Sequence, residues 1–156
     1  MGDDARDDPG VIAPPLLVYA VAFGVAVILH ALVPLRVGAW PMRLVGGTLL
    51  IAAGILLARG AFRAMGLAGT SANPYASTTA LVTQGPFRWT RNPLYLAQTF
   101  LYVGMAMALN TLWPLVWLPA VLLVMRYGVI EREERRLERQ FGEVYQAYAA
   151  MVRRWF

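Results

Sequence analysis

Four apolar runs, each close to the length needed to cross a bilayer, constrain this chain more than any other feature. In the first, from Leu16 to Val33, every residue except His30 is apolar, glycine or tyrosine, and a spanning helix needs roughly 20 such residues. The other three runs are residues 44–62, 94–109 and 112–130. The chain is 58% hydrophobic and only 15% charged over 156 residues, which is too apolar for an ordinary soluble domain. The sequence therefore predicts an all-α integral membrane bundle of about four transmembrane helices, folded as a single domain over 1–156.

Three polar segments complete the predicted organisation. Residues 1–12 contain four aspartates and are expected to form a disordered cytosolic tail. Residues 67–91 are rich in Gly, Pro, Ser and Thr and are expected to form a long irregular loop, which in a compact protein is usually functional or disordered. Residues 131–152 combine charged and apolar positions at helical spacing, which predicts an amphipathic C-terminal helix.

The distribution of arginine predicts the orientation in the membrane. All 14 basic residues are arginine, against nine acids, for a net charge of +5. With four spans, twelve of these arginines fall on the side of the termini and the long loop, and only Arg36 and Arg43 on the other. Because positive charge accumulates on the cytoplasmic side, we expect a multi-pass protein of a prokaryotic inner membrane with both termini in the cytoplasm. The expected partners are the bilayer and a lipophilic substrate, not nucleic acid, and the oligomeric state stays open.

Composition also limits the chemistry. The chain has no cysteine and a single histidine, so disulfides, thiolate ligands and a cysteine nucleophile are excluded, and an imidazole cluster is short of ligands. We therefore expect no metal site.

Two local patterns are candidates for binding. Asn92-Pro93 predicts the start of the third helix. This segment is either a plain helix start or a binding site for a carboxylate or phosphate, because Arg88 and Arg91 lie beside the positive end of the helix dipole. Glu134 falls on the apolar face of the C-terminal helix and Glu133 flanks it. These glutamates either form salt bridges on a solvated helix or accept hydrogen bonds from ribose hydroxyls or an amine.

Arg126 lies near the end of the fourth apolar run. An arginine in that position either extends its guanidinium to the membrane interface or holds an anionic substrate head.

Two separated motifs carry a resemblance to a known family. The segment from Leu81 to Tyr95 reads LVTQGPFRWTRNPLY and contains an Arg-X-Pro-X-Tyr motif, and Glu133-Glu134 precedes a Phe-Gly-X-X-Tyr-X-X-Tyr motif that ends at Tyr148. In this order and spacing the motifs, which cover roughly the C-terminal half, resemble the isoprenylcysteine carboxyl methyltransferase and phospholipid methyltransferase superfamily. That resemblance implies an integral membrane enzyme that uses S-adenosyl-L-methionine and releases S-adenosyl-L-homocysteine.

The resemblance also implies a cofactor site, with residues 67–91 as a cofactor loop. The residues that match the family's cofactor-contacting positions are Thr79, Ala80, Leu81, Val82, Phe87, Asn92, Pro93, Leu94, Tyr95, Glu133 and Glu134. Of the two glutamates, Glu133 is the better candidate. The family's usual histidine is Asn92 here, so a proton-transfer role at that position is absent while hydrogen bonding and N-capping are kept.

The expected function is methyl transfer to a lipophilic acceptor. The sulfonium donor is already activated, so the protein mainly aligns donor and acceptor, and no catalytic residue is assigned. Isoprenylcysteine-like carboxylates, lipids and small thiols all qualify as acceptors; anionic ones are favoured because no base is evident. The acceptor is expected to enter between the third and fourth spans. A membrane NADPH-dependent sterol-type reductase and a non-enzymatic scaffold or carrier are the alternatives.

Overall fold

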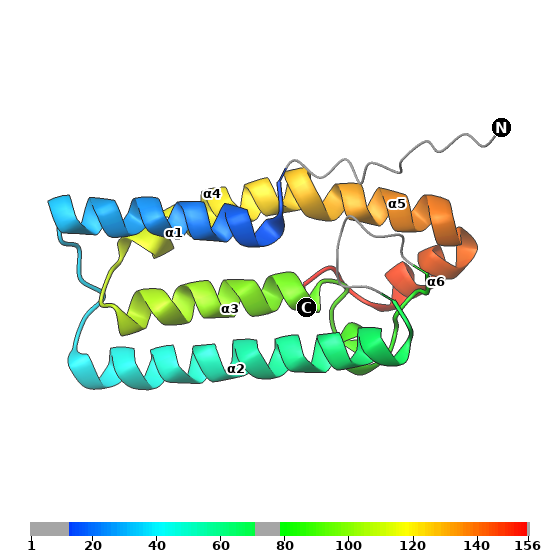
Figure 1. Cartoon of the computed structure of the whole chain (residues 1–156), viewed down its shortest axis with the longest axis horizontal. Helices are drawn as coiled ribbons and strands as arrows, with labels where there is room; N and C mark the ends of the chain where they lie inside the picture. Colours follow the sequence, from blue (N-terminus) through cyan, green and yellow to red (C-terminus); the bar gives the residue numbers. More distant parts are fainter. Residues whose placement is uncertain (1–12, 71–78, 156) are drawn as a thin grey trace.

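The computed structural model describes residues 13–70 and 79–155, and over these residues it is all-α. The expected acidic tail of residues 1–12 lies outside the described residues. Figure 1 shows the long helices packed side by side, with α5 and α6 at one end of the bundle. The elements are α1 (Pro15–Leu32), α2 (Trp40–Leu67), the 3-10 turn η1 (Gly85–Arg88), α3 (Pro93–Ala108), α4 (Trp113–Met125), the π-helical segment η2 (Arg126–Ile130), α5 (Glu131–Phe141) and α6 (Glu143–Met151).

Three of the helices are long and apolar enough to cross a membrane, which indicates an integral membrane protein. Among the described residues these are Pro15–Leu32, Trp40–Leu67 and the continuous helix Trp113–Phe141 formed by α4, η2 and α5. The fourth bundle member, α3, has 16 residues, or roughly 24 Å at 1.5 Å per residue. The side chains that α1 and α2 turn outward are mainly large and apolar, as expected of surfaces that face lipid.

The helices pack in two pairs. α1 lies beside α4, α2 lies along α3, and α3 also contacts α1 and α4 (Figure 1). Tyr19, Phe23 and Tyr102 meet edge to face in the centre, a geometry that aromatic quadrupoles favour. The bundle core therefore lies between α1, α3 and α4.

Glycines bring α2 and α3 into close contact. A Cβ on Gly47 would lie 2.9 Å from the Gly104 carbonyl oxygen, and one on Gly104 would lie 2.9 Å from the Gly47 carbonyl oxygen. At Gly54 the same substitution would meet the Ala97 carbonyl oxygen at 2.9 Å. Small residues at these positions let the two backbones approach, as in other membrane helix pairs.

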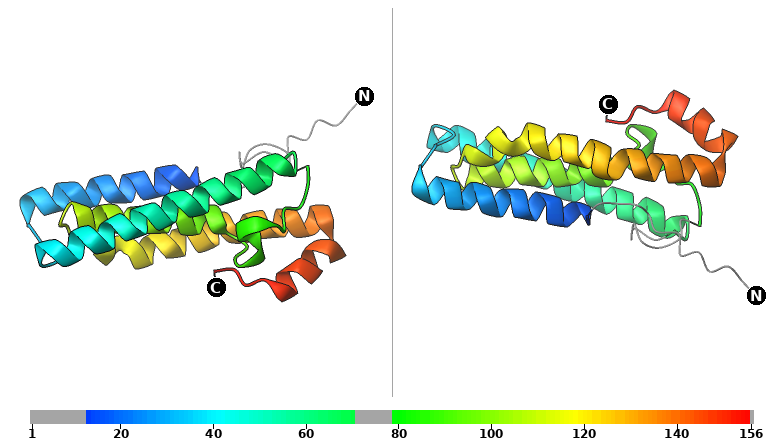
Figure 2. Two further views of the ribbon diagram at one scale, coloured as in Figure 1. Left: turned by 90° about the horizontal axis from the view of Figure 1, so that it is seen from below. Right: turned by 90° about the horizontal axis from the view of Figure 1, so that it is seen from above.

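The end of the bundle that carries the two short connections is closed by hydrogen bonds between them. Leu112 N–H donates to the Leu35 carbonyl, Val37 N–H donates to Asn110 Oδ1, and Trp113 Nε1–H donates to the Val33 carbonyl. The opposite end carries the long loop, α5 and α6. In both views of Figure 2, α5 extends beyond the start of α1 and α6 turns back toward the bundle.

Two helices differ from the sequence prediction. The second helix, expected over 44–62, runs from Trp40 to Leu67, so α2 includes residues assigned to the links. The C-terminal helix, expected as one piece over 131–152, breaks at Gly142, where φ is 52°. After this break Val144 and Met151 are exposed, whereas Tyr145 and Tyr148 are buried.

Candidate active site

A cavity of about 570 Å³ lies at the end of the bundle that carries the long loop. Its walls come from the start of α1, the end of α2, the loop, the first turns of α3, and α5 and α6. Volumes of roughly 300–1,000 Å³ are usual for small-molecule sites. Segments that are far apart in the sequence therefore meet around a space of the right size for a cofactor.

Tyr95 and Glu133 join two walls of the cavity. Tyr95 Oη donates to Glu133 Oε2 at 2.6 Å, which links the first turn of α3 to α5. Tyr95 also belongs to the buried core, where its carbonyl accepts from Thr99 Oγ1 at 2.9 Å. A carboxylate has about four lone-pair positions, and the Tyr95 hydroxyl uses one of those on Glu133.

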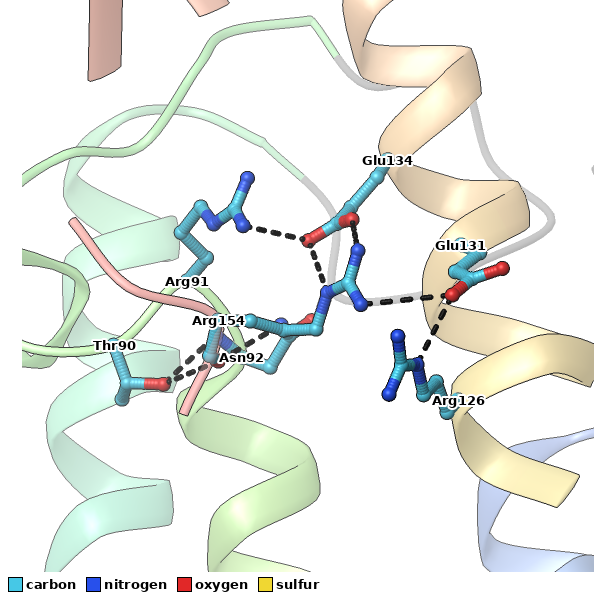
Figure 3. Close-up of polar contacts among 7 residues, drawn as sticks. All are labelled: Thr90, Arg91, Asn92, Arg126, Glu131, Glu134 and Arg154. Carbon is cyan, nitrogen blue, oxygen red and sulfur yellow. Dashed lines mark hydrogen bonds and ion pairs between the residues drawn. The ribbon is translucent and has the colours of Figure 1, made fainter. Parts of the chain in front are cut away.

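Glu134 is occupied by two arginines. Arg154 reaches its carboxylate through Nε at 3.2 Å and Nη2 at 2.6 Å, the bidentate arrangement that arginine favours. Arg91 Nη2 lies 3.4 Å from Glu134 Oε1. The exposed fractions of the Arg91 and Glu134 side chains are only 16% and 14%, so the contacts are partly shielded from water. Figure 3 shows Glu134 between the two guanidinium groups.

The same cluster holds the C-terminal segment against the start of α3. Thr90 Oγ1 and Asn92 Nδ2 both donate to the Arg154 carbonyl, at 2.9 and 3.1 Å, and Arg91 N–H donates to the Arg153 carbonyl at 3.0 Å. Figure 3 shows the contacts of Thr90 and Asn92 with Arg154. The strap formed by residues 152–155 therefore fixes both the backbone before α3 and the ion pairs of Glu134.

Asn92 corrects one prediction from the sequence. It stands at the N-cap position and Pro93 begins the helix, as expected, but its side chain makes no capping hydrogen bond. Its amide instead binds the Arg154 carbonyl. The N–H groups of the first turn of α3 are therefore not covered by the Asn92 side chain.

Two tyrosines of α6 close the cavity. Tyr145 and Tyr148 are buried and lie edge to face, with ring centroids 6.3 Å apart, and Tyr148 Oη donates to the Phe87 carbonyl at 2.7 Å. Burial raises the pKa of each phenol to about 12, helped by Glu134 at Tyr145 and by Tyr145 at Tyr148. Both are therefore neutral hydroxyl groups at physiological pH.

Most residues expected at the cofactor site lie around this cavity. Ten of the eleven border it: Ala80, Leu81, Val82, Phe87, Asn92, Pro93, Leu94, Tyr95, Glu133 and Glu134. Thr79 lies beside a lining residue, because its N–H donates to Thr70 Oγ1 at 3.3 Å. Of the three arginines considered for anions, Arg91 borders the cavity, whereas Arg88 and Arg126 do not. Arg126 pairs with Glu131 at 3.1 Å.

Several lining residues were not singled out from the sequence. Phe62 and Met65 lie at the end of α2, Tyr145 and Tyr148 on α6, and Gln98 on α3. The tyrosines were visible as part of the second motif, and Gln98 as a polar residue inside an apolar run. Nothing in the local pattern marked Phe62 and Met65, because apolar residues at the end of a membrane helix are ordinary.

The apolar part of the cavity lies elsewhere than expected. Its lining includes Leu16 of α1, Ala58 and Phe62 of α2 and Leu101 of α3, and no described residue of α4. The fourth span thus contributes no described residue to the cavity, and the expected route between the third and fourth spans stays a prediction. Gly104 of α3 packs against α2.

The cavity has the features that S-adenosylmethionine requires. Arg91 Nε is buried and has no hydrogen-bond partner among the described residues, which suits a carboxylate. Glu133 offers a carboxylate that can accept from hydroxyl or amine groups, and Leu81, Val82 and Phe87 offer apolar surface for a ring. The residues that line the cavity therefore fit the cofactor.

The described residues thus form an all-α bundle with three candidate membrane spans and a cavity of about 570 Å³ at one end. Residues 42–144 match the family model described as phospholipid methyltransferase. The chain belongs to this family, and it is a membrane methyltransferase of the kind that uses S-adenosylmethionine. No curated protein and no solved structure matches the chain. Family membership decides among the function classes raised by the sequence in favour of the methyltransferase, against the reductase and the carrier.

Proposed function

We propose that this enzyme transfers a methyl group from S-adenosylmethionine to the headgroup amine of a phospholipid. The observation that carries the proposal is the shape of the cavity, which has charged walls at Arg91 and Glu133 and apolar walls at Leu16 and Leu101. A soluble, charged cofactor suits the first part, and a lipid acceptor from the bilayer suits the second. The family description supports a phospholipid as the acceptor.

The cofactor would be held by residues of the loop, α3 and α5. Arg91 would bind its carboxylate, Glu133 its hydroxyl or amine groups, and Phe87 with Val82 its ring. When bound, S-adenosylmethionine supplies a methyl group on a sulfonium that needs no further activation. The Tyr95–Glu133 hydrogen bond keeps the carboxylate oriented before binding, so that less ordering is needed on binding.

The protein's contribution to the reaction is alignment and exclusion of water. The strap of residues 152–155 fixes the start of α3 through Thr90 and Asn92, and Tyr145 and Tyr148 cover the site with neutral side chains. Positioning of two reactants in a site of this kind contributes much of the rate of a displacement reaction. No described side chain is required to form a covalent intermediate.

The proposed orientation places the cavity on the cytoplasmic side. With α3 as a fourth span, the long loop, α5, α6 and both termini share one side, which also carries twelve of the 14 arginines. The positive-inside rule then assigns that side to the cytoplasm, where S-adenosylmethionine is available.

The proposed methyl acceptor is an amine, whereas the sequence analysis favoured anionic acceptors. That preference rested on the absence of a base, because an ammonium group must lose a proton before it attacks. The folded protein places a carboxylate, Glu133, in the cavity wall, where it accepts from Tyr95 Oη. The objection to an amine is therefore weaker in the folded protein than in the motif alone.

The proposal is tested by methyl transfer in lipid nanodiscs. Purified protein is incubated with S-adenosylmethionine that carries a tritiated methyl group, in discs of phosphatidylethanolamine or of phosphatidylcholine. We expect label in phosphatidylethanolamine and none in phosphatidylcholine, whose nitrogen has no lone pair to attack with. Label in neither lipid, from protein that binds S-adenosylhomocysteine, would contradict the phospholipid amine as acceptor.

A further inference from the structure

Gln98 is a polar side chain of α3 with an unexplained position. It borders the cavity, yet its Oε1 is buried and has no hydrogen-bond partner among the described residues. Buried polar atoms in proteins are nearly always hydrogen-bonded, and each exception calls for an explanation. Inside a membrane bundle the exception is more costly still, because bulk water is not there to replace the missing partner.

The position of Gln98 along α3 separates the two parts of the cavity. Tyr95, which contacts Glu133, lies one turn before it, and Leu101 lies one turn after it on the same face. Three residues of helix correspond to about 4.5 Å along the axis. Gln98 therefore lies just beyond the charged walls, where the apolar walls begin.

An amide oxygen at this boundary can accept a hydrogen bond from the headgroup of the lipid that receives the methyl group. A carbonyl oxygen accepts hydrogen bonds from N–H or O–H groups and repels other acceptors. A lipid whose tails lie along Leu16 and Leu101 would bring its polar end to the level of Gln98, next to the proposed cofactor site at Glu133.

Burial alone does not make such a site, as Tyr102 shows. Its hydroxyl is also buried without a partner among the described residues, and it lies on the same helix one turn further on. It does not border the cavity, and it packs against Tyr19 and Phe23. Of these two α3 side chains with an unpaired buried oxygen, only Gln98 borders the cavity.

We propose that Gln98 determines acceptor specificity by accepting a hydrogen bond from an N–H group of the phospholipid headgroup. This inference rests on the proposed function and adds to it a residue and an atom, Oε1. The cofactor contacts at Arg91 and Glu133 do not involve Gln98, so the two parts of the site are separable by mutation.

The test compares Gln98→Met with Tyr102→Phe. Each variant removes a buried polar atom from α3, but only the first removes it from the cavity wall. In nanodiscs of phosphatidylethanolamine, Gln98→Met is expected to raise the KM for the lipid about tenfold, the usual effect of losing one hydrogen bond to a charged or strongly polar partner. Tyr102→Phe is expected to leave that KM unchanged. Both variants should bind S-adenosylhomocysteine as the wild type does.

A lipid with fewer donors sharpens the test. With N,N-dimethylated phosphatidylethanolamine, the KM penalty of Gln98→Met should be smaller, because the headgroup has fewer N–H groups to lose. An unchanged KM in Gln98→Met, or an equal increase in KM on both lipids, would show that Gln98 does not accept a hydrogen bond from the headgroup N–H. Failure of the wild type itself to bind S-adenosylhomocysteine would overturn the proposed function, which is a separate result.

Discussion

The two ends of the bundle are held together in different ways. At the end with the short connections, hydrogen bonds to neutral acceptors close the structure: Leu112 N–H binds the Leu35 carbonyl, Val37 N–H binds Asn110 Oδ1, and Arg43 Nη1 binds the Ala108 carbonyl. At the other end Glu134 lies between Arg91 and Arg154, and a cavity of about 570 Å³ separates the helices. The glycine contacts of α2 and α3 extend from the first end toward the second and end near Gly54.

This difference assigns separate tasks to the two ends. Close packing and hydrogen bonds to neutral acceptors stabilise the fold, so substitutions at the closed end should reduce stability and leave binding unchanged. Charged groups around a cavity are retained where a ligand uses them, so substitutions at the open end should reduce binding more than stability. The following variants examine this division.

The largest effect is expected for Glu133→Gln at the open end. The amide can still accept from Tyr95 Oη but has lost the charge that a cofactor amine or hydroxyl would use, and we expect about 100-fold weaker binding of S-adenosylhomocysteine. Titration calorimetry in nanodiscs measures it. Glu143→Gln, the same change on an exposed residue of α6, is the control and should bind normally. Equal affinities in the two variants would show that Glu133 is not a cofactor contact.

The next effect is expected at the α2–α3 contact. Gly104→Ala adds a Cβ that would lie 2.8 Å from Ile51 Cγ1 and 2.9 Å from the Gly47 carbonyl oxygen, and such overpacking costs about 1–3 kcal/mol. Gly24→Ala, in α1, meets nothing within 4 Å and should not destabilise the protein. Thermal unfolding in detergent compares the two. A Gly104→Ala protein as stable as Gly24→Ala would mean that the two helices do not pack this closely.

A smaller effect on binding is expected for Arg154→Gln. The change removes the bidentate contact to Glu134 and loosens Arg91, which the same carboxylate orients. We expect about tenfold weaker binding of S-adenosylhomocysteine, equivalent to about 1.4 kcal/mol. Arg139→Gln, on the exposed side of α5, is the matched control. Unchanged binding in Arg154→Gln would show that the strap of residues 152–155 does not contribute to the binding site.

The smallest effect is expected for Asn110→Ala at the closed end. Asn110 has φ of 55°, a conformation that asparagine tolerates better than alanine, and its Oδ1 accepts from Val37 N–H at 3.2 Å. Alanine is strained at this φ and lacks the side-chain acceptor, so the substitution should cost about 1 kcal/mol of stability, measured as a lower unfolding temperature. Binding of S-adenosylhomocysteine should not change; a loss of affinity would contradict the division between the ends.

The helices were predictable from the sequence because hydrophobicity alone requires them. A run such as Leu16–Val33 has no alternative in a bilayer, and α1 occupies Pro15–Leu32. The start of α3 was equally determined by Asn92-Pro93. The break at Gly142 was not, because a single glycine is tolerated within many helices, and only tertiary contacts decide whether it ends one.

The candidate site was predictable in its members but not in its connections. The motifs identified Tyr95, Glu133 and Glu134, and all three border the cavity. That Glu133 pairs with Tyr95 while Glu134 pairs with Arg154 depends on how α5 leaves η2 and on the path of the last residues. Contacts between segments 20 or more residues apart leave no trace in local spacing, which is why the strap and the apolar lining from α1 and α2 were missed.

The central claim is that the open end of the bundle binds the methyl donor, and calorimetric titration of S-adenosylhomocysteine tests it most directly. Wild-type protein in lipid nanodiscs is titrated with this ligand and, separately, with NADPH. We predict saturable, micromolar binding of S-adenosylhomocysteine and none of NADPH. Absence of S-adenosylhomocysteine binding by protein that unfolds cooperatively would contradict the claim.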